Sequence, residues 1–421
     1  MSWRGNALQA LFSRFGGGDA PPLRVVFWDG DSFDFAPDPK VTITLSSPRQ
    51  LTSALCGNFD ELAKAYIGGE LVVDGSIEEV THAGIALAQR LEKLPTLRRF
   101  LRLAALVSSL RSRRSDPSYV RYRYDASNEF YRLWLDERMI YSCAYFRTGT
   151  EDIDVAQAQK LEHMCRKLLL NPGERLLDIG CGWGGLLGWA ERHHHVSGVG
   201  VTLSEIQYDY ARRRLANADV EIRLQDYRDV SDDQFDKIIS VDMYEHVGSR
   251  DLPAYFQKIF DLLRPGGAFL NQGIVTTDCG GSKRSVGGGF IDKYAFPGGA
   301  LSHLSRIIAE VSKAGFEVVD VEDLRPHYVR TLDSWSRRLE ARREDAIAAA
   351  GAERYRIWRV YLAGMAEAFD RGWLSVVQVL AYKPVEDRLA PRPWTRDYQY
   401  NGETIPRIAT RADVEHDVEK S

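Results

Sequence analysis

The stretch LLDIGCGWGG, from Leu176 to Gly185, joins an apolar run to a glycine-rich turn. Its glycines fit both G-x-G-x-x-G and G-x-G-x-G. Turns of this kind hold the pyrophosphate of a dinucleotide, the phosphates of a nucleotide, or S-adenosylmethionine. The spacing does not choose among these three ligands, so the choice depends on the neighbouring residues.

A dinucleotide site carries an acidic residue about twenty positions after the turn, where this chain has Thr202. A P-loop requires Gly-Lys-Ser/Thr, and positions 176–187 contain neither Lys nor Arg. Asp178 instead stands two residues before Gly180, the first glycine. A carboxylate at a strand end suits a ligand with a cationic amino-acid tail. The glycines allow the backbone to approach that ligand closely. The turn therefore predicts a site for S-adenosylmethionine.

The composition bounds the class of protein. The chain has 421 residues, enough for two or three domains, and its 44% hydrophobic and 27% charged residues are typical of a globular protein. A net charge of -4 gives no general attraction to nucleic acid. An odd number of scattered cysteines argues against a disulfide framework and for a reducing cytosol. The five cysteines are Cys56, Cys143, Cys165, Cys181 and Cys279.

Targeting and metal signals are weak. Positions 1–18 are amphipathic and lack the apolar core of a signal peptide, and no apolar run approaches the ~18 residues of a membrane span. No cysteine pair has the spacing of metal ligands. The run His193-His194-His195 closes an expected helix, where a solvated helix end is favoured over a metal site.

Before the glycine turn, the chain predicts a small α+β domain over 23–81. The β-rich runs LRVVFWDG, VTITLSS and ELVVDGS alternate with one helix over LTSALCGNFDELAKAYIGG. Residues 90–114 then carry eight Lys or Arg against one acidic residue. This segment is either an ordinary helical linker or an amphipathic helix that lies on anionic lipid.

From the glycine turn onward, strands and helices alternate with short loops, which predicts a doubly wound, mostly parallel sheet with ligands at the carboxyl ends of its strands. Two later runs, FEVVDVEDL and LSVVQVLAYK, could complete that sheet. We divide the chain into an amino-terminal domain with its basic linker (1–118), a Rossmann-like catalytic domain (119–385) and a peripheral tail (386–421).

Six stretches resemble the bacterial cyclopropane fatty acid synthases and the related mycolic acid methyltransferases. They are LLDIGCGWGG, YSCAYF (141–146), GVTLSEIQ (200–207), LQDYRD (224–229), DMYEHVG (242–248) and RPHYVRTLDSW (325–335). The resemblance covers about 121–383. AYIGGELVVDG resembles the amino-terminal extension of the bacterial enzymes, which implies a lipid-binding type of first domain.

The resemblance implies two sets of site residues. The donor set is Tyr141, Ser142, Asp178, Gly180, Cys181, Gly182, Gly184, Thr202, Leu203, Gln207, Asp226 and Tyr227. A bicarbonate ion would be held by Cys143, Glu245, Gln272, Tyr328 and the backbone of Ile274. Ser204-x-x-Gln207 also fits a capping box, and Cys143 also fits a small buried packing residue. His246 and His327 are interpreted as structural positions.

The reaction implied is methyl transfer from S-adenosylmethionine to a cis double bond of a phospholipid acyl chain, followed by deprotonation by bicarbonate to close a cyclopropane ring. Such an enzyme would be cytoplasmic and would associate peripherally with the anionic inner face of the cell membrane. A homodimer is one oligomeric state compatible with the sequence.

Three positions depart from the family pattern. Gln272 replaces a histidine, and an amide can hold bicarbonate but cannot carry a proton. The change is either tolerated or marks a methyl-branched or methylene product. Tyr124 replaces another common histidine, and Met365 replaces a cysteine, which excludes a thiolate nucleophile there. A soluble amine N-methyltransferase and a non-catalytic lipid-binding protein are the competing hypotheses.

Overall fold

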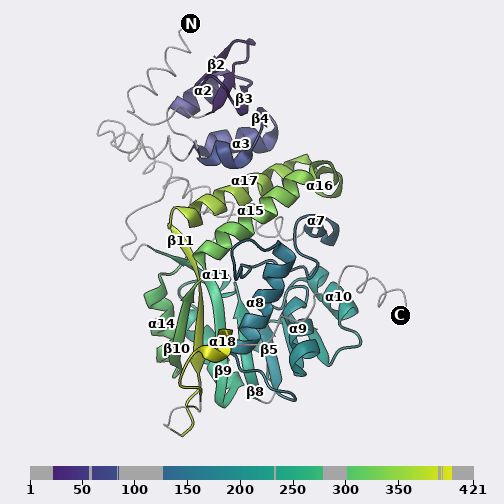
Figure 1. The fold of residues 1–421 in the computed structure, drawn as a ribbon, viewed down its shortest axis with the longest axis vertical. Coiled ribbons are helices and arrows are strands. Elements are labelled where there is room, and N and C mark those ends of the chain that lie inside the picture. Colours follow the sequence, from purple (N-terminus) through teal and green to yellow (C-terminus); the bar gives the residue numbers. More distant parts are fainter. Residues whose placement is uncertain are drawn as a thin grey trace. The chain divides into compact units, whose positions relative to one another are not determined.

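The computed structural model describes residues 22–55, 59–82, 84, 127–231, 234–277, 301–386, 390 and 392–400. It divides into two compact units, whose elements are labelled in Figure 1. The first unit is drawn from Met1–Ala126, Gly280–Gly298 and Leu339–Glu367, and the second from Ser127–Cys279, Gly299–Arg338 and Ala368–Ser421.

The second unit is built on a seven-stranded sheet with the strand order β10-β11-β9-β8-β5-β6-β7. The pairs from β9 to β7 are parallel, whereas β11 runs antiparallel to both β9 and β10. The strands are β5 (Arg175–Ile179), β6 (Ser197–Thr202), β7 (Val220–Leu224), β8 (Phe235–Val241), β9 (Leu263–Thr276), β10 (Glu317–Asp323) and β11 (Leu374–Tyr382). This confirms the predicted doubly wound, mostly parallel sheet, including both late strands.

Helices cover both faces of this sheet, because successive side chains of a strand point to opposite faces and both sets are apolar. In β5, Leu176 enters one core and Leu177 the other. Helix α8 supplies Leu161 to the first core, and α12 and α14 supply Ile259 and Ile307 to the second. The helices of this unit include α7 (Asn128–Arg132), α8 (Ile153–Lys167), α9 (Gly185–His194), α10 (Glu205–Arg214), α11 (Tyr244–Val247), α12 (Leu252–Leu262), α14 (Leu304–Lys313) and α18 (Asp397–Tyr400), with the 3-10 turn η1 (Tyr227–Asp229).

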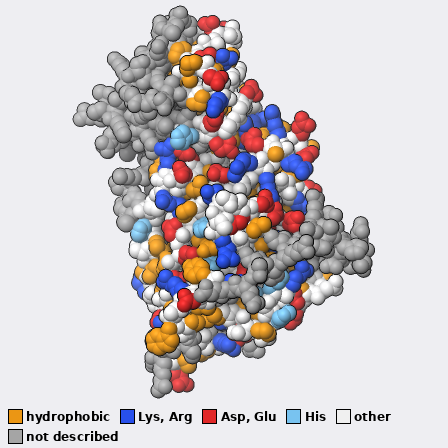
Figure 2. Space-filling view, in the orientation of Figure 1, with side chains coloured by type: hydrophobic (Ala, Val, Ile, Leu, Met, Phe, Trp, Pro, Cys, Tyr) orange, Lys and Arg blue, Asp and Glu red, His pale blue; other side chains and the backbone are white. Residues whose placement is uncertain are grey.

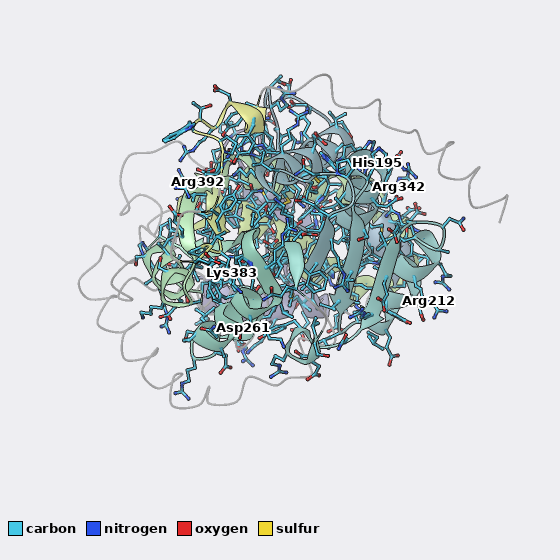
Figure 3. The ribbon with its side chains drawn as sticks, turned by 90° about the horizontal axis from the view of Figure 1, so that it is seen from below. His195, Arg212, Asp261, Arg342, Lys383 and Arg392 are labelled. Atoms are coloured by element: carbon cyan, nitrogen blue, oxygen red, sulfur yellow. The ribbon has the colours of Figure 1, made fainter. Side chains whose placement is uncertain are left out.

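Two contacts between residues far apart in the sequence lie near the amino-terminal ends of β9 and β10. Lys383, labelled in Figure 3, donates to the carbonyls of Phe260 and Leu263 at 2.7 Å each, where α12 passes into β9. Arg392, also labelled, pairs with Glu317 at 2.7 Å and fastens the start of the tail to β10. The described part of the tail is therefore attached to the sheet.

The first unit contains a four-stranded sheet with the order β2-β1-β3-β4. Its elements are β1 (Leu23–Val26), β2 (Ser32–Asp34), β3 (Val41–Leu45), β4 (Leu71–Asp74), α2 (Pro48–Leu55) and α3 (Phe59–Gly68). Three strands confirm the predicted runs. The single helix predicted over 51–69 is wrong: two helices occupy the range 48–68, with 56–58 outside the described residues.

Later segments of the chain complete the first unit. The end of α15 (Arg325–Ala341), all of α16 (Arg343–Ala350) and most of α17 (Ala352–Asp370) belong to this unit. Ala363 of α17 belongs to the core that Val25 and Tyr66 help to form. Arg359 of α17 is buried, donates to the Tyr66 hydroxyl and the Gly75 carbonyl at 2.9 and 2.7 Å, and pairs with Glu340.

Several predictions remain outside the described residues. The basic segment 90–114 and Tyr124 are among them, as is most of the tail. The boundaries at 118 and 385 stay a prediction. None of the helices in the described ranges combines the length and apolar character that a bilayer crossing requires. Figure 2 shows acidic and basic side chains intermixed over the visible face, in line with the small net charge.

Candidate active site

The glycine turn follows β5 and leads directly into α9. Gly180, Gly182 and Gly184 have φ values of +82°, +53° and +76°, in the left-handed region that other residues rarely adopt. A Cβ at Gly180 would collide with the Met243 side chain, whereas one at Gly182 would meet no atom within 4 Å. The N–H groups of Gly180 and Cys181 donate to Val201 of β6 at 3.0 and 3.1 Å. The backbone is thus fixed against the sheet and open on the Gly182 side.

Asp178 lies one residue before the end of β5 and is only 3% exposed. Burial raises the pKa of its carboxyl to about 7, and the charge of Lys160 acts in the opposite direction. A buried carboxylate with this pKa is a ready partner for an ammonium group, because pairing restores the charged form that burial disfavours. Together with the open glycine backbone, Asp178 fits the cationic tail of S-adenosylmethionine.

Tyr141 and Ser142 lie in an irregular segment that is hydrogen-bonded to side chains of α8. Lys160 Nζ donates to Ser142 Oγ at 2.7 Å, and Gln157 Nε2 donates to the Ser142 carbonyl at 2.9 Å. Asp136, earlier in the same segment, accepts the N–H groups of Ile140 and Arg138 at 2.7 and 3.0 Å.

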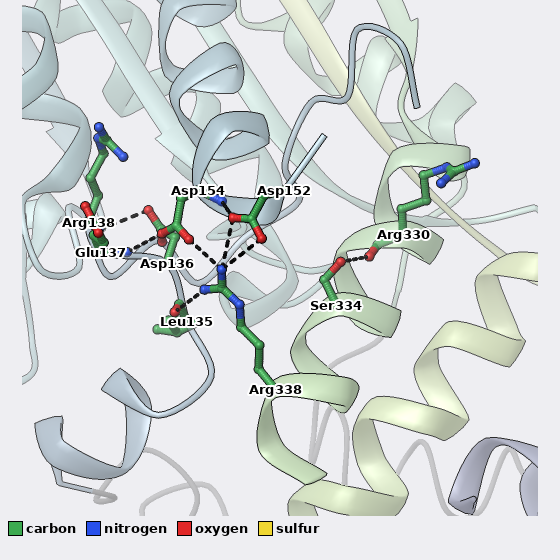
Figure 4. Close-up of polar contacts among 9 residues, drawn as sticks. All are labelled: Leu135, Asp136, Glu137, Arg138, Asp152, Asp154, Arg330, Ser334 and Arg338. Carbon is green, nitrogen blue, oxygen red and sulfur yellow. Dashed lines mark hydrogen bonds and ion pairs between the residues drawn. The ribbon is translucent and has the colours of Figure 1, made fainter. Parts of the chain in front are cut away.

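Arg338 ties this segment to two other elements. From α15 it donates to the Leu135 carbonyl and to Asp152 at 3.0 Å each, and to Asp154 at 2.5 Å. Asp154 in turn accepts the N–H of Glu137 at 2.7 Å (Figure 4). The start of α8, the end of α15 and the segment carrying Tyr141 are therefore fixed together.

Aromatic rings pack around Tyr141 and the glycine turn. Its ring lies 5.3 Å from that of Trp335 and 5.6 Å from that of Trp134. Tyr131 bridges Tyr141 and Trp183, with ring centroids at 6.0 and 5.0 Å. The faces of aromatic rings attract cations, so this cluster suits a site that handles positive charge.

The end of β6 brings together the next predicted donor residues. The Thr202 hydroxyl donates to Gln207 Oε1 at 3.1 Å, and Thr202 Oγ1 accepts the N–H of Ser204 at 3.2 Å. Ser204 caps α10 by accepting the N–H of Gln207 at 3.4 Å. Half of the capping box is thus formed. In the other half, the N–H of Ser204 is accepted by Thr202 Oγ1 and not by the Gln207 side chain. Leu203 is 71% exposed, unusual for leucine, and therefore available to a ligand.

Asp226 and Tyr227 stand at the end of the neighbouring strand, β7. Asp226 caps η1 and accepts from the Arg228 guanidinium at 2.6 and 2.9 Å, which lowers its pKa. Tyr227 packs edge-on against Tyr255 with the ring centroids 5.2 Å apart. The two residues lie at the carboxyl edge of the sheet, as the donor set does at β5 and β6.

Glu245 is the buried centre of the predicted anion cage. Its Oε1 accepts the Ile274 N–H at 2.5 Å, and its Oε2 is buried with no hydrogen-bond partner among the described residues. Burial, reinforced by the charge of Asp242, raises the pKa of this carboxyl well above its usual range. The Ile274 backbone was predicted to hold an anion, and its N–H is engaged by Glu245. The orphaned Oε2 is a polar atom that a bicarbonate ion would satisfy.

Tyr244 and Gly273 explain this arrangement. The Tyr244 hydroxyl donates to the Ile274 carbonyl at 2.8 Å, and a Cβ at Gly273 would collide with the Tyr244 ring. The glycine therefore lets α11 lie directly on β9 and brings Glu245 to Ile274.

Cys143 and Tyr328 are the other two expected cage residues. Cys143 is fully buried, its thiol donates to the carbonyls of Ala144 and Leu324 at 3.3 and 3.8 Å, and burial raises its pKa. It is a protonated donor rather than a nucleophile. Tyr328 is buried with its ring 4.7 Å from that of Phe369.

Gln272 is fully buried in β9, and its amide faces two other side chains. Nε2 donates to Asp242 Oδ1 at 3.5 Å, and Oε1 accepts from Gln378 of β11 at 3.1 Å. Its hydrogen bonds therefore run to Asp242 and Gln378. In addition to burial, the charge of Asp242 raises the pKa values of Glu245 and Cys143.

Sequence reasoning missed Lys160, Gln157 and Asp242. Burial raises the pKa of the Asp242 carboxyl to about 6, and the residue adopts a left-handed φ of +55°. A signal existed for Asp242, since it opens the quoted motif DMYEHVG. Lys160 carried none, because lysine on a helix is ordinarily a surface residue.

Three of the histidines make contacts within the fold. His327 Nδ1 accepts the N–H of Phe146 at 3.0 Å, and its ring stacks on Tyr145 with the centroids 4.7 Å apart. His194 pairs with Glu162 at 3.1 Å, and His193 packs on Trp189. Within the described ranges, His, Cys, Asp and Glu form no group suited to a metal ion. Met365 is buried in α17.

Comparison with known proteins assigns a family. Residues 111–379 match the family described as mycolic acid cyclopropane synthetase, and residues 10–91 match a domain of unknown function, DUF7884. A probable fatty acid methyltransferase of Pseudomonas putida is 42% identical over 389 residues, covering 90% of this chain and 96% of that protein.

Two further relatives connect this match to cyclopropane synthases. The cyclopropane-fatty-acyl-phospholipid synthase of Escherichia coli K12 is 40% identical over 269 residues, which covers 63% of this chain and 68% of that protein. The mycolic acid cyclopropane synthase CmaA1, solved with SAH and CTAB, superposes with a TM-score of 0.60 at 34% identity, covering 64% of this chain and 99% of that one. With a family match over more than half of its length, this chain belongs to the mycolic acid cyclopropane synthetase family and is an S-adenosylmethionine-dependent methyltransferase.

Proposed function

We propose that this protein converts cis double bonds in phospholipid acyl chains to cyclopropane rings, with a bicarbonate ion held beside Glu245. The observation that carries the proposal is the buried Glu245 carboxyl, whose Oε2 has no hydrogen-bond partner among the described residues. A carboxyl whose pKa is raised by burial can offer its proton as a hydrogen-bond donor to an anion.

The donor side of the proposal rests on the glycine turn. S-adenosylmethionine, when bound, supplies the methyl group. Asp178 would pair with its ammonium tail, and the exposed Leu203 and the Thr202–Gln207 pair would border the nucleoside. Tyr141, held between Trp134 and Trp335, would present an aromatic face to positive charge and exclude water.

The acceptor side rests on proton handling by Glu245. Bicarbonate, when bound, supplies the base that ring closure requires. The raised pKa of Glu245 keeps a proton on its carboxyl, and the Ile274 N–H holds Oε1, so that proton belongs on Oε2. A proton there can be donated to an anion and taken back, which is the behaviour of a general acid and base.

A second product remains open because of Gln272. Its amide is bound to Asp242 and Gln378, and it has no titratable proton near neutral pH. If the cage needs a histidine to relay a proton, methyl transfer would end in a methyl-branched or methylene chain. The similarity to a probable fatty acid methyltransferase is compatible with either product.

We infer further that the protein works at the anionic inner face of the cell membrane. The support is the sequence of 90–114, with eight basic residues among apolar ones. Each basic residue near such a surface contributes about 1 kcal/mol. Flotation with anionic vesicles should therefore weaken with salt, and salt-independent binding to neutral vesicles would contradict this part of the proposal.

The decisive experiment incubates pure protein with methyl-labelled S-adenosylmethionine, unsaturated phospholipid vesicles and controlled bicarbonate. Mass spectrometry and NMR of the lipids should show rings, at a rate that depends on bicarbonate. Branched or methylene chains would select the second product, and Gln272→His should then shift the product toward rings. Methylation of a soluble amine panel with no lipid product would overturn the proposal.

A further inference from the structure

Lys160 is buried at the middle of α8, only 2% exposed, in a part of the molecule rich in acidic groups. Burial lowers its pKa, and the charges of Asp242, Cys143, Asp136 and Asp178 raise it, in that order. A buried lysine is costly unless its surroundings use the charge. The neighbours of Lys160 indicate what that use is.

The first contact of Lys160 is with the donor segment. Its Nζ donates to Ser142 Oγ at 2.7 Å, while Gln157, one turn earlier on α8, donates to the Ser142 carbonyl at 2.9 Å and to the Ile140 carbonyl at 3.4 Å. Ser142 lies in no helix or strand, so these bonds fix its position. The ammonium group is therefore part of the support for Tyr141 and Ser142.

The second effect of Lys160 is on charge. Asp136 already has two backbone N–H donors, and Asp242 has the Gln272 amide. For Asp178 the charge of Lys160 is what opposes desolvation, and for Asp242 it is the largest effect that does so. The thiol of Cys181 also responds to the Asp178 charge. Without Lys160, both carboxyls would take up a proton more readily.

We propose that Lys160 is a positioning residue of the methyl-donor site: its buried ammonium group holds Ser142 in place and supplies a positive charge to the surroundings of Asp178, the expected partner of the donor's ammonium tail. This inference rests on the proposed function of the glycine turn. Lys160 is a cation near a site for a cationic tail, and its charge is useful there because it favours the ionised form of Asp178. A neutral Asp178 would offer the ammonium group much less attraction.

The test measures binding of S-adenosylhomocysteine by calorimetry from acidic to alkaline pH. In the wild type, affinity should rise with pH as Asp178 ionises, around its pKa of about 7. Lys160→Met should move that midpoint upward by about one pH unit or more, since a nearby opposite charge lowers a carboxyl pKa by about 1–3 units. Lys160→Arg, which keeps the charge, should restore the wild-type midpoint.

Lys167→Met is the matched control. Lys167 is fully buried on the same helix, and it pairs with Glu322 at 2.5 Å and Asp320 at 3.6 Å instead of with the donor segment. Its removal should lower stability without moving the midpoint. If Lys160→Met does not fold, Lys160→Gln gives the same comparison with an amide that can still donate to Ser142.

The outcomes separate the two claims. A wild type that does not bind S-adenosylhomocysteine at any pH would defeat the proposed function itself. If the wild type binds S-adenosylhomocysteine and both neutral Lys160 variants keep its midpoint and its affinity, the donor site stands and the role of Lys160 is overturned. An upward shift reversed by Lys160→Arg supports it.

Discussion

The N–H of Ile274 donates to Glu245 Oε1 at 2.5 Å, and this bond leaves Oε2 as the buried atom without a partner among the described residues. The carboxyl is thus oriented by the backbone of β9 on one side and free to act on the other. Buried carboxyl oxygens are ordinarily paired, so the unpaired Oε2 supports the role proposed for Glu245.

Glu245→Gln should separate activity from stability. The variant keeps an acceptor for the Ile274 N–H but cannot donate and recover a proton, so turnover should fall about 10²-fold or more. The folded pKa of Glu245 lies above its unfolded value of 4.5, so the stability from its neutral form is complete below that value and is lost as pH rises. The variant should therefore unfold at higher urea than the wild type at alkaline pH. Undiminished turnover would remove Glu245 from the chemistry.

Asp178→Asn should weaken donor binding through loss of one charge-assisted contact, worth about 1.5–3 kcal/mol, as measured by calorimetry. Asp236→Asn is the control, because Asp236 lies at the opposite end of the sheet, where it accepts the Arg175 N–H at 2.6 Å. Its donor affinity should match the wild type. Equal affinities in all three proteins would show that the turn does not hold a cationic tail.

Gln272 and Gln378 should behave as one unit in stability measurements. Gln272→Leu leaves Gln378 Nε2 buried and unpaired, which costs about 1–3 kcal/mol of unfolding free energy. Replacing both by Leu should cost less than the two single changes added together, since both partners are then removed. Additive losses in urea unfolding would show that the 3.1 Å contact contributes nothing.

His327 should make stability depend on acid. Burial lowers its pKa below 6.5, and the charge of His163 lowers it further. The charges of Glu322, Glu151 and Asp323 raise it. The folded protein therefore resists protonation, so stability is complete above 6.5 and falls as pH drops through it. Its Nδ1 accepts the Phe146 N–H only when neutral, and His327→Gln should keep that acceptor without the titration. An identical acid slope in both proteins, measured by urea unfolding, would contradict this account.

Local patterns predicted the sheet well. The strands around the glycine turn are apolar runs bounded by turns, and Gly180 and Gly184 are required by backbone angle and by crowding from Met243 and Leu215. Such constraints are written in a few neighbouring residues. Strand β2 was missed because three residues are too few to establish an alternating pattern.

Long-range contacts could not be predicted in the same way. Lys160 acquires its role because α8 places it beside Ser142, and nothing in the neighbouring sequence marks it as buried. The orientation of Gln272 depends on Gln378, which is 106 residues away. The resemblance identified Gln272 as a site position, but only the register of β9 against β11 places its amide on Gln378.

Arg359 and Tyr66, which meet in the first unit, are separated by 293 residues. During synthesis the first sheet leaves the ribosome long before the helix that completes its core. At about 5–20 residues per second, the delay is on the order of 15–60 s. The newborn chain must carry an unfinished apolar surface throughout that interval. A premature stop before Arg359 would therefore leave an unfinished first unit that is prone to aggregate, in addition to an incomplete enzyme.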